Sequence, residues 1–384
     1  MMRTGVAVLG STGSVGQQTL DVIRSLPDRF RVVALATGRN VTMLEEQARE
    51  FRPRLIYAGR EAGYIRDRIR NGDITAHWAE MEEMAAHPDV DVVVVATVGA
   101  TGLGPSLAAA RAGKAIAIAN KEVLVMAGHI VTAEARRYGA ELRPVDSEHS
   151  AIWQCLWGES AESVDRLIIT ASGGGLRDLA TEELERVTAE QALRHPNWQM
   201  GPKITVDSAT LLNKGLECIE AHWLFGVPYE RIEVVLHRES IVHSLVEFVD
   251  GSVKAQLGVP DMRLPIQCAL TYPERVPGAA IPRLDLKMIG SLTFGIPTAS
   301  RYPCLALTLE AGRRGGTAPA VLAAADEIAV GHFLTGHIRY VDIPRVIEDA
   351  LSADHHTTNP SLEQVIDADQ RARAFAEDWV KAKA

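Results

Sequence analysis

Residues 5–16 read Gly5-Val-Ala-Val-Leu-Gly10-Ser-Thr-Gly13-Ser-Val-Gly16. An apolar run typical of a buried strand leads into a Gly-x-x-Gly-x-x-Gly turn, and residues 17–25 have the pattern of a helix. Glycines permit a tight turn and a close approach of the backbone to a pyrophosphate, and the helix N-terminus offers free N–H groups to it. A glycine triplet alone is weak evidence, but strand, turn and helix together predict a dinucleotide-binding domain.

A second strand, predicted at 31–36, indicates which dinucleotide is bound. It is followed by Thr37-Gly-Arg39-Asn40. A site for NAD usually carries a carboxylate here for the ribose 2′-hydroxyl. No acidic residue is present, and the Arg39 guanidinium suits a 2′-phosphate. We therefore expect NADP(H); the alternative is that Arg39 is a solvated loop residue.

Helical and strand patterns alternate as far as residue 145, which is typical of a doubly wound parallel sheet. The β-branched run at 91–97 predicts a fully buried parallel strand. A strand at 115–119 ends in Asn120-Lys121-Glu122, and ligands of open α/β sheets bind at such carboxyl ends. The other elements expected here are helices at 41–51, 61–70, 102–112 and 123–138 and strands at 55–58, 74–78 and 140–145.

Two carboxylates close this first part, in Arg143-Pro-Val-Asp146-Ser147-Glu148-His-Ser150. On an extended strand end, residues i and i+2 point to the same side. Asp146 and Glu148 are therefore expected to aim at one point. Two oxygen ligands with open positions beside them suit Mg²⁺ or Mn²⁺. Taken alone, the stretch also fits a solvated turn in which Ser147 or Ser150 caps a helix.

The pattern changes after residue 150. A strand at 164–170 leads into the turn Ala-Ser172-Gly-Gly-Gly, which suits an anion held by backbone N–H groups and a hydroxyl. Residues 195–202 carry two prolines, a glycine and Trp198 outside any periodic pattern, which favours a mobile flap. The alternative is that Trp198 is an aromatic residue packed in a loop.

A helix is predicted from Ser208, which can cap it, to about Phe225. Asn213 and Glu217 are four residues apart and share a face, with Lys214 beside them. A polar face of this kind is ordinarily solvated. Here leucine and isoleucine residues flank it, which indicates a buried helix, and buried Lys and Glu need partners. We therefore expect this face to line a site.

The remaining chain predicts a second, smaller sheet and a helical end. Residues 260–301 are rich in proline and glycine and indicate a connecting arm. Alanine-rich helices after it indicate a C-terminal bundle, the last one starting at Asn359-Pro360. The strands are expected at 232–236, 244–248 and 253–257, and the helices at 305–312, 319–334, 344–352 and 360–383.

Composition excludes several classes of protein. The 384 residues carry a net charge of −9 without a Lys/Arg-rich run, so nucleic acid is not expected as a partner. Four widely spaced cysteines indicate neither a zinc knuckle nor a disulfide framework. No apolar run approaches the ~20 residues that span a bilayer, and the N-terminal sequence lacks a signal-peptide pattern. We expect a soluble cytoplasmic protein with no membrane partner.

Six segments together resemble the 1-deoxy-D-xylulose 5-phosphate reductoisomerase family, and the resemblance extends over essentially the whole chain. The segments are Gly10–Gly16, Asn120–Glu122, Val145–His149, Thr170–Gly174, His195–Trp198, and Val206–Thr210 with Asn213–Glu217. Each is modest by itself, but all six in this order are very specific. The sequence departs from the family pattern, in ways that bear on loop stiffness and inhibitor fit rather than chemistry, at Gly175, Gln199, Pro202, Leu211, Leu212, Arg238 and Glu239.

The residues and the resemblance together predict an α/β protein in four parts. A Rossmann-like, doubly wound NADPH-binding domain is expected at 1–146. A central α/β catalytic and metal-binding domain with a smaller sheet, and with the flap 195–202, is expected at 147–260. A connecting arm at 261–302 and a C-terminal helical bundle at 303–384 complete the chain.

The resemblance implies three groups of site residues. Asp146, Glu148 and Glu217 are implied as ligands of a divalent metal, Mg²⁺ or Mn²⁺. Together with Lys121 they form the implied catalytic set. Substrate contacts are implied at the phosphate end for Ser172, His195, Ser208, Asn213 and Lys214 and elsewhere for Lys121, Ser147, Glu148, Trp198 and Glu217. Cofactor contacts are implied at Thr12, Gly13, Ser14, Val15, Gly38, Arg39, Asn40, Asn120, Glu122 and Gly201.

The activity implied is the NADPH- and metal-dependent rearrangement and reduction of 1-deoxy-D-xylulose 5-phosphate to 2-C-methyl-D-erythritol 4-phosphate, in non-mevalonate isoprenoid biosynthesis, by a homodimer. The residue types fit this chemistry. A metal acts as a Lewis acid on vicinal oxygens of the sugar phosphate, and Lys121 adds positive charge nearby. Closing Trp198 over the site would keep water from the aldehyde intermediate.

Two other functions remain as alternatives. Another NADP-dependent reductase, of the semialdehyde or homoserine dehydrogenase type, would not call for three carboxylates around a metal, so EDTA sensitivity of turnover separates it. A non-catalytic nucleotide-sensing protein would not need an intact set of acidic and phosphate-binding residues, and this set is intact.

Overall fold

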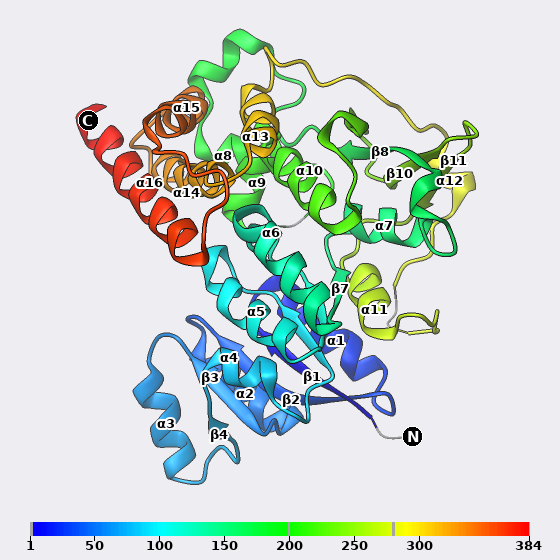
Figure 1. The fold of residues 1–384 in the computed structure, drawn as a ribbon, viewed down its shortest axis with the longest axis vertical. Helices are drawn as coiled ribbons and strands as arrows, with labels where there is room; N and C mark the ends of the chain where they lie inside the picture. The colour runs from blue at the N-terminus through cyan, green and yellow to red at the C-terminus, as the bar shows by residue number, and fades with distance from the viewer. Residues whose placement is uncertain (1–2, 199, 279–280, 384) are drawn as a thin grey trace. The chain divides into compact units, whose positions relative to one another are not determined.

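The structure, a computed structural model, describes residues 3–198, 200–278 and 281–383 (Figure 1). The chain forms two compact units, each built from separate stretches of sequence. The first unit consists of Met1–Val123, His129–Ser150 and Asp261–Pro282. The second unit consists of Leu124–Gly128, Ala151–Pro260 and Arg283–Ala384.

The first unit is built on a seven-stranded sheet with the order β4-β3-β2-β1-β5-β6-β7, and every pair of neighbours is parallel. The chain runs outward from β1 in one direction and then returns to build from β5 in the other. The fold class predicted for this part, a doubly wound parallel sheet, is therefore confirmed. The strands are β1 (Thr4–Leu9), β2 (Phe30–Thr37), β3 (Leu55–Ala58), β4 (His77–Trp78), β5 (Val92–Val95), β6 (Ala115–Ile118) and β7 (Glu141–Pro144).

The apolar runs of these strands are buried because helices pack against the sheet. Val6, Val8, Leu35 and Val94 are fully buried and share one core with helical residues such as Leu44. The helices that contribute to this unit are α1 (Ser14–Ser25), α2 (Val41–Phe51), α3 (Ala62–Arg70), α4 (Met81–Ala86), α5 (Leu103–Arg111), α6 (Lys121–Tyr138) and α11 (Arg263–Thr271), with a 3-10 turn η1 (Gly99–Gly102).

The predicted connecting arm is not irregular throughout. Its first part forms α11, whose Ile266, Ala269 and Leu270 are buried in the core of the first unit. This helix was not predicted, because prolines and glycines dominate the surrounding stretch. Tertiary burial of an apolar face outweighs that composition. The finer division of the chain at 146, 260 and 302 stays a prediction.

The second unit contains the smaller sheet, in the order β11-β10-β8-β9. Strand β10 is antiparallel to both β8 and β11, and β9 is parallel to β8. On one face of this sheet, Leu167, Ile169 and Val246 are buried against apolar residues of the helix α10 (Leu212–Phe225). The strands are β8 (Val164–Ala171), β9 (Ile232–Leu236), β10 (Val242–Phe248) and β11 (Val253–Leu257).

The C-terminal helices belong to the second unit and share a core with the helices that follow the flap. Val206, Leu212 and Leu216 lie in the same apolar cluster as Val330 and Ala372. The helices of this unit are α7 (Ser147–Cys155, which begins in the first unit), α8 (Ala189–Ala192), α9 (Pro202–Thr210), α10 (Leu212–Phe225), α12 (Leu286–Ile289), α13 (Pro303–Arg314), α14 (Ala318–Leu334), α15 (Ile343–Ala353) and α16 (Leu362–Lys383), with four 3-10 turns η2 (Ala161–Ser163), η3 (Thr181–Arg186), η4 (Tyr229–Arg231) and η5 (Tyr340–Asp342).

Two predicted helix starts are wrong. Ser208 does not cap a helix, because α9 already begins at Pro202 and the backbone breaks at Leu211, whose φ is 56°. The last helix begins at Leu362 rather than at Pro360. The Ser361 Oγ accepts a hydrogen bond from the Gln364 N–H at 3.3 Å, and this side-chain cap sets the start.

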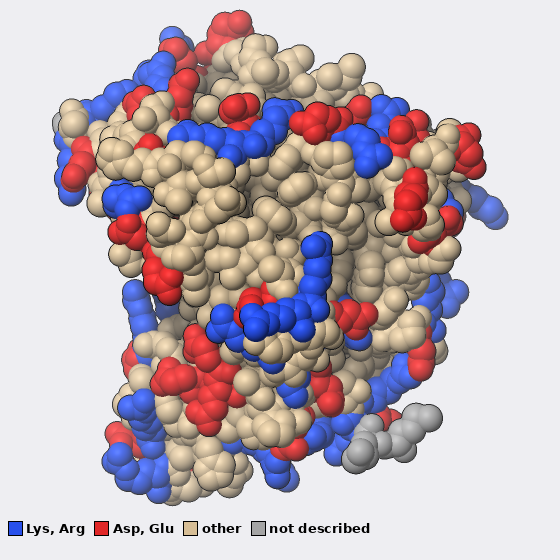
Figure 2. Space-filling view, in the orientation of Figure 1, with Lys and Arg blue, Asp and Glu red and all other residues tan. Residues whose placement is uncertain are grey.

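No helix in the described ranges is both long enough and apolar enough to cross a bilayer. On the face drawn in Figure 2, lysine and arginine side chains lie among aspartate and glutamate side chains. The mixture of signs on this face agrees with the absence of a Lys/Arg-rich run in the sequence.

Candidate active site

The carboxyl ends of β1, β2 and β6 carry most of the predicted cofactor residues. Because these strands are parallel, their carboxyl ends lie at one edge of the sheet. Gly10 has a φ of 96°, and a Cβ there would collide with the backbone of Ala96, so the tight turn into α1 requires glycine. The residues that follow β1 and β2 are Thr12, Gly13, Ser14 and Val15, and Gly38, Arg39 and Asn40.

Side chains fix these two loops. The Thr12 and Thr37 hydroxyl oxygens lie 2.5 Å apart and join the loops after β1 and β2. The Asn40 side chain accepts a hydrogen bond from the Met43 N–H at 3.1 Å and so caps α2. Arg39 is exposed in the same loop. The predicted cofactor residue Gly201 belongs to the second unit, where it precedes the first residue of α9.

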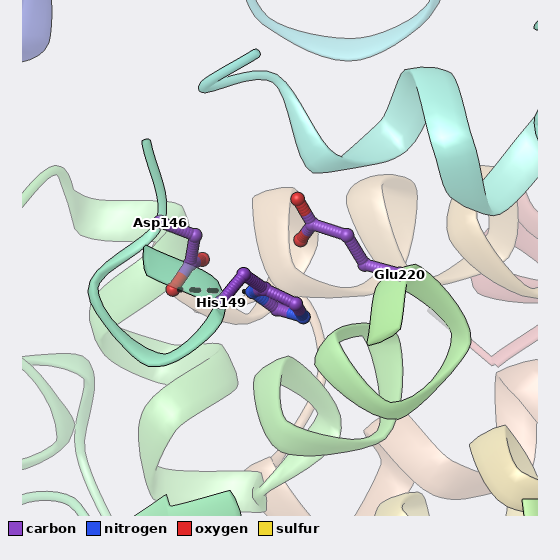
Figure 3. A group of neighbouring side chains, drawn as sticks. All are labelled: Asp146, His149 and Glu220. Atoms are coloured by element: carbon purple, nitrogen blue, oxygen red, sulfur yellow. Dashed lines mark ion pairs between the residues drawn. The ribbon is translucent and has the colours of Figure 1, made fainter. Parts of the chain in front are cut away.

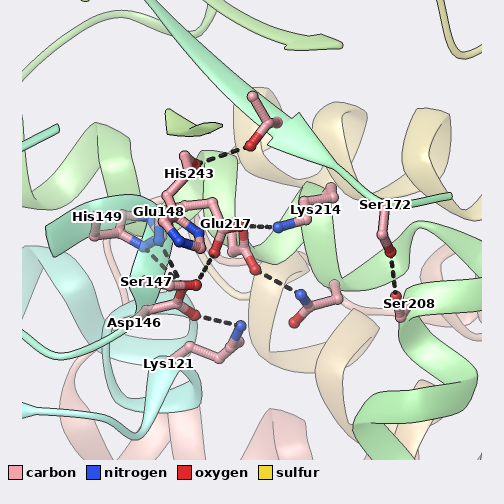
Figure 4. A network of polar contacts seen from close by, with 12 residues as sticks. Lys121, Asp146, Ser147, Glu148, His149, Ser172, Ser208, Lys214, Glu217 and His243 are labelled. Atoms are coloured by element: carbon pink, nitrogen blue, oxygen red, sulfur yellow. Dashed lines mark hydrogen bonds and ion pairs between the residues drawn. The ribbon is translucent and has the colours of Figure 1, made fainter. Parts of the chain in front are cut away.

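The segment Asn120–Glu122 begins α6, at the carboxyl end of β6. The Asn120 Oδ1 accepts from the Val123 N–H at 3.3 Å, while its Nδ2 donates to Thr97 Oγ1 at 3.1 Å and to the Gly99 carbonyl at 3.0 Å. Lys121 is buried, and its Nζ lies 2.7 Å from Asp146 Oδ2 (Figure 4). The first unit thus places a cation beside the first predicted metal ligand.

The sequence predicted Asp146 and Glu148 on an extended strand end, and this prediction is wrong. Glu148 lies in the first turn of α7, and the Asp146 Oδ1 accepts a hydrogen bond from its N–H at 3.3 Å. The Ser147 hydroxyl donates to Glu148 Oε2 at 2.5 Å, and His149 Nδ1 lies 3.7 Å from Asp146 Oδ1 (Figure 3). Strand pairing ends at Pro144, so a capped helix start holds both carboxylates.

In the second unit, the turn after β8 meets the start of the flap. Ser172 Oγ lies 2.9 Å from His195 Nε2. It also lies 3.5 Å from Ser208 Oγ (Figure 4). Gly174 has a φ of 68°, and a Cβ there would overlap the backbone of Ala209. Glycine is therefore required for the turn to approach α9. His195 and Ser208 lie 23 and 36 residues beyond Ser172 in the chain. The three polar side chains form a small hydrogen-bonding group, called the cradle below.

The ring of His195 is fixed in one neutral tautomer. Its Nδ1 accepts hydrogen bonds from the N–H groups of Asn197 at 3.2 Å and Trp198 at 2.9 Å, so the proton resides on Nε2. Nε2 then donates to Ser172 Oγ. Burial, with the positive charges of Arg177 and Lys214, lowers the pKa of His195 from 6.5 to about 4. The neutral ring organises the flap turn and still offers one N–H to an anion.

This shift predicts how the flap responds to pH. Because the folded-state pKa is lowered, the contribution of His195 to stability is fully present above pH 6.5 and is lost as the pH falls through about 4. We expect the ring of the ligand-free protein to titrate near pH 4 in a nitrogen-detected NMR experiment, with the His195→Gln variant identifying the signal. A midpoint at or above the ordinary value would show that the ring is not held neutral.

Helix α10 presents the polar face that the sequence predicted. Glu217 is 1% exposed, its Oε1 accepts from Asn213 Nδ2 at 2.5 Å, and its Oε2 lies 2.8 Å from Lys214 Nζ. Asn213 and Lys214 are buried as well. A Cβ on Gly215 would overlap Thr308 of α13, so glycine lets the two helices pack closely. The buried Lys and Glu have each other as partners, as burial of charge requires.

The described part of the flap contacts the loop before β10. The Asn197 Nδ2 donates to the Arg238 carbonyl at 2.7 Å and to Ser240 Oγ at 2.8 Å. The rings of Trp198 and His243 lie 6.1 Å apart. Asn197 was expected only as part of the segment His195–Trp198, and Ser240 and His243 were not expected as site residues. The one signal for His243 is its position next to the strand predicted at 244–248. The predicted departure at Gln199 lies outside the described residues.

Comparison with known proteins shows the family of the chain. Family sequence models match in three places: 1-deoxy-D-xylulose 5-phosphate reductoisomerase at residues 6–128, its C-terminal domain at 142–225, and the DXP reductoisomerase C-terminal domain at 257–375. The reductoisomerase of Pelotomaculum thermopropionicum is 53% identical over 373 residues, covering 96% of each chain. The chain belongs to the 1-deoxy-D-xylulose 5-phosphate reductoisomerase family.

Other members of the family are similar to this chain in sequence and in structure. The enzyme of Geobacillus kaustophilus is 55% identical over 373 residues, covering 96% of this chain and 98% of its own. A crystal structure of a DOX-P reductoisomerase in complex with NADPH, fosmidomycin and magnesium superimposes with a TM-score of 0.93 at 39% identity, covering 98% of each chain. The Zymomonas mobilis enzyme in complex with NADPH gives a TM-score of 0.91 at 40% identity, covering 99% of each chain.

Proposed function

We propose that this protein catalyses the NADPH- and divalent-metal-dependent rearrangement and reduction of 1-deoxy-D-xylulose 5-phosphate to 2-C-methyl-D-erythritol 4-phosphate, in non-mevalonate isoprenoid biosynthesis. The observation that carries the proposal is the family relationship over 96% of the chain. The buried Asn213–Lys214–Glu217 face and the Ser172–His195–Ser208 cradle support it. A small charged substrate requires partners of this kind.

Asp146, Glu148 and Glu217 are proposed as the ligands of Mg²⁺ or Mn²⁺. Asp146 and Glu148 belong to the first unit and Glu217 to the second, and the family resemblance implies all three as ligands. They fit a hard cation, because Asp146 and Glu217 already contact the ammonium groups of Lys121 and Lys214. When bound, the metal supplies Lewis-acid stabilisation to vicinal oxygens of the substrate. The protein's part is to hold the ligands: a capped helix start orients two and a buried helix face orients the third.

The phosphate end of the substrate is proposed to bind to Ser172, His195, Ser208, Asn213 and Lys214. Two hydroxyls, an imidazole N–H and an amide donate hydrogen bonds, and Lys214 supplies the positive charge. Because His195 is neutral, the charge complement for the phosphate comes from Lys214 rather than from the flap. Ser147, Lys121 and Trp198 are proposed to contact the rest of the substrate, where the Lys121 ammonium stabilises negative charge that develops on oxygen.

NADPH is proposed to bind at the carboxyl edge of the parallel sheet, with the pyrophosphate at the α1 N-terminus and the 2′-phosphate near Arg39. The residues proposed to contact it are Thr12, Gly13, Ser14, Val15, Gly38, Arg39, Asn40, Asn120, Glu122 and Gly201. Bound NADPH supplies the hydride. Closure of the flap around Trp198 excludes water while the aldehyde is present.

Two further features are part of the proposal. A homodimer is consistent with the exposed apolar side chains Leu286, Met288, Phe294 and Ile296. We also propose a cytoplasmic location, as expected from the sequence.

The test is turnover itself. Loss of the reduced-nicotinamide absorbance is followed with 1-deoxy-D-xylulose 5-phosphate as substrate, with NADPH or NADH, and with Mg²⁺ or EDTA. We expect turnover with NADPH and Mg²⁺, abolition by EDTA and slower turnover with NADH. Metal-independent reduction of a semialdehyde, without turnover of the sugar phosphate, would contradict the proposal.

A further inference from the structure

A buried ion-pair triad in the second unit lies outside all of the site residues named so far. Lys203 Nζ lies 2.6 Å from Asp207 Oδ2 and 2.6 Å from Asp326 Oδ2. The Asp207 and Asp326 side chains are 3% and 0% exposed, whereas Lys203 is 30% exposed. Lys203 and Asp207 belong to α9, and Asp326 lies within α14.

The triad is placed at the root of the flap. Lys203 is the second residue of α9, directly after Gly201 and Pro202, where the flap ends. The Thr205 hydroxyl also donates to the Gly201 carbonyl at 2.8 Å. The first turn of α9 is therefore held to α14 through Lys203 and to the last residues of the flap through Thr205. A hinge for flap motion then has to lie before Lys203.

The same helix carries Ser208 of the phosphate cradle. Lys203 and Asp207 are four residues apart and share a face of α9, and Ser208 is turned by about 100° from Asp207. One face thus joins α9 to α14 while the neighbouring face directs the Ser208 hydroxyl toward Ser172, 3.5 Å away. A rotation or shift of α9 that breaks the first contact also moves the second.

The electrostatics favour a positioning role over a stabilising one. Two buried carboxylates converge on one ammonium, and burying such charges costs a large desolvation penalty that apolar residues of similar size would avoid. An ion-pair arrangement does, however, fix the relative position of two helices more narrowly than apolar contact, because each bond has a preferred distance and direction. We therefore expect the ion pairs to fix the position of α9 relative to α14 rather than to add stability.

We propose that Lys203 is a positioning residue: its ammonium, held by Asp207 and Asp326, fixes the root of the flap and the direction of Ser208, and so sets the affinity for the phosphate group of the substrate. This inference rests on the proposed function, because it assigns the cradle of Ser172, His195 and Ser208 to a phosphate.

The test compares Lys203→Met, Lys203→Arg and Asp326→Asn, with Lys381→Met as a matched control on an exposed lysine. Weakening one hydrogen bond to a charged phosphate lowers affinity by about tenfold to a hundredfold. We therefore expect Lys203→Met to raise the KM for the sugar phosphate by about this factor. We expect smaller changes in kcat and in the Kd for NADPH, to which the root of the flap contributes only Gly201. Lys203→Arg should restore much of the KM, Asp326→Asn should have an intermediate effect, and Lys381→Met should have none.

Binding of inorganic phosphate, measured by titration calorimetry on the same proteins, separates this inference from the proposed function. Weaker phosphate binding by Lys203→Met supports it even if the wild-type protein does not turn over the sugar phosphate. The inference is overturned if Lys203→Met folds and both its KM and its phosphate binding are unchanged. It is equally overturned if the melting temperature falls while KM and phosphate binding stay the same. If Lys203→Met does not fold, unchanged KM and phosphate binding in Asp326→Asn overturn the inference instead.

Discussion

Replacing Glu217 by glutamine is expected to lower kcat by several orders of magnitude while the protein remains folded. Lewis-acid stabilisation contributes several kcal/mol to lowering the barrier, and each ~1.36 kcal/mol corresponds to about tenfold in rate. Glutamine keeps the size of Glu217 and a carbonyl oxygen that can accept from Asn213, but it removes the negative charge from the cation site. Affinity for Mg²⁺ should fall, and raising Mg²⁺ or Mn²⁺ should recover part of the rate.

The cost to folding should be moderate. Lys214 loses its charged partner, and a hydrogen bond between charged groups is worth about 1.5–3 kcal/mol, so the melting temperature should decrease without loss of the fold. The dissociation constant for NADPH should not change, because its proposed contacts lie largely in the first unit. Glu230→Gln, which alters an exposed carboxylate shortly after the same helix, is the matched control and should be neutral. Normal turnover with unchanged metal dependence in Glu217→Gln would leave Asp146 and Glu148 without a third ligand.

Replacing Lys214 by methionine is expected to raise the KM for the sugar phosphate roughly tenfold to a hundredfold, because a charged hydrogen bond worth about 1.5–3 kcal/mol is lost. Lys214 is buried, and it is the charged member of the proposed phosphate-end set. Methionine fills a similar volume, so packing around α10 should be kept. The measurement is the KM at saturating NADPH and Mg²⁺, with Ser208→Ala, a neutral hydrogen-bond loss, expected to have a smaller effect.

The two substitutions on α10 should differ in their metal dependence, which makes them informative as a pair. Glu217 keeps its carboxylate in Lys214→Met and loses a competing cation 2.8 Å away, so affinity for Mg²⁺ should be unchanged or higher. In Glu217→Gln that affinity should fall. Lys381→Met, on an exposed lysine of α16, serves as the control for loss of a positive charge. A fall of metal affinity in Lys214→Met, or an unchanged KM, would contradict the assignment of Lys214 to the phosphate.

Local sequence pattern determined most of the first unit and one important face of the second. The parallel sheet follows from alternating strand and helix patterns, and the turn at Gly10 follows from a backbone conformation that glycine adopts readily. The Asn213–Lys214–Glu217 contacts follow from spacing along a single helix. In each case the residues that interact are near one another in the chain, so periodicity alone brings them together.

The helix at α7 shows where local pattern was insufficient. Residues 146–148 fit both an extended strand end and a capped helix start. The structure has the second, in which the Asp146 carboxylate accepts from the Glu148 N–H. The two alternatives differ by little in intrinsic preference, and pairing of β7 with β6 ends at Pro144. Tertiary context decides between conformations that are so close in local free energy.

Long-range packing alone decided the remainder. The break at Leu211 has no glycine or proline to mark it, yet its left-handed backbone is held by a side chain buried with Ala171, Tyr302 and Leu305. The cradle of Ser172, His195 and Ser208 joins three separate segments, and Lys203 meets Asp326 on a helix far along the chain. Family resemblance named the cradle residues without their geometry, because pairings of this kind depend on how helices pack, which the spacing of residues does not encode.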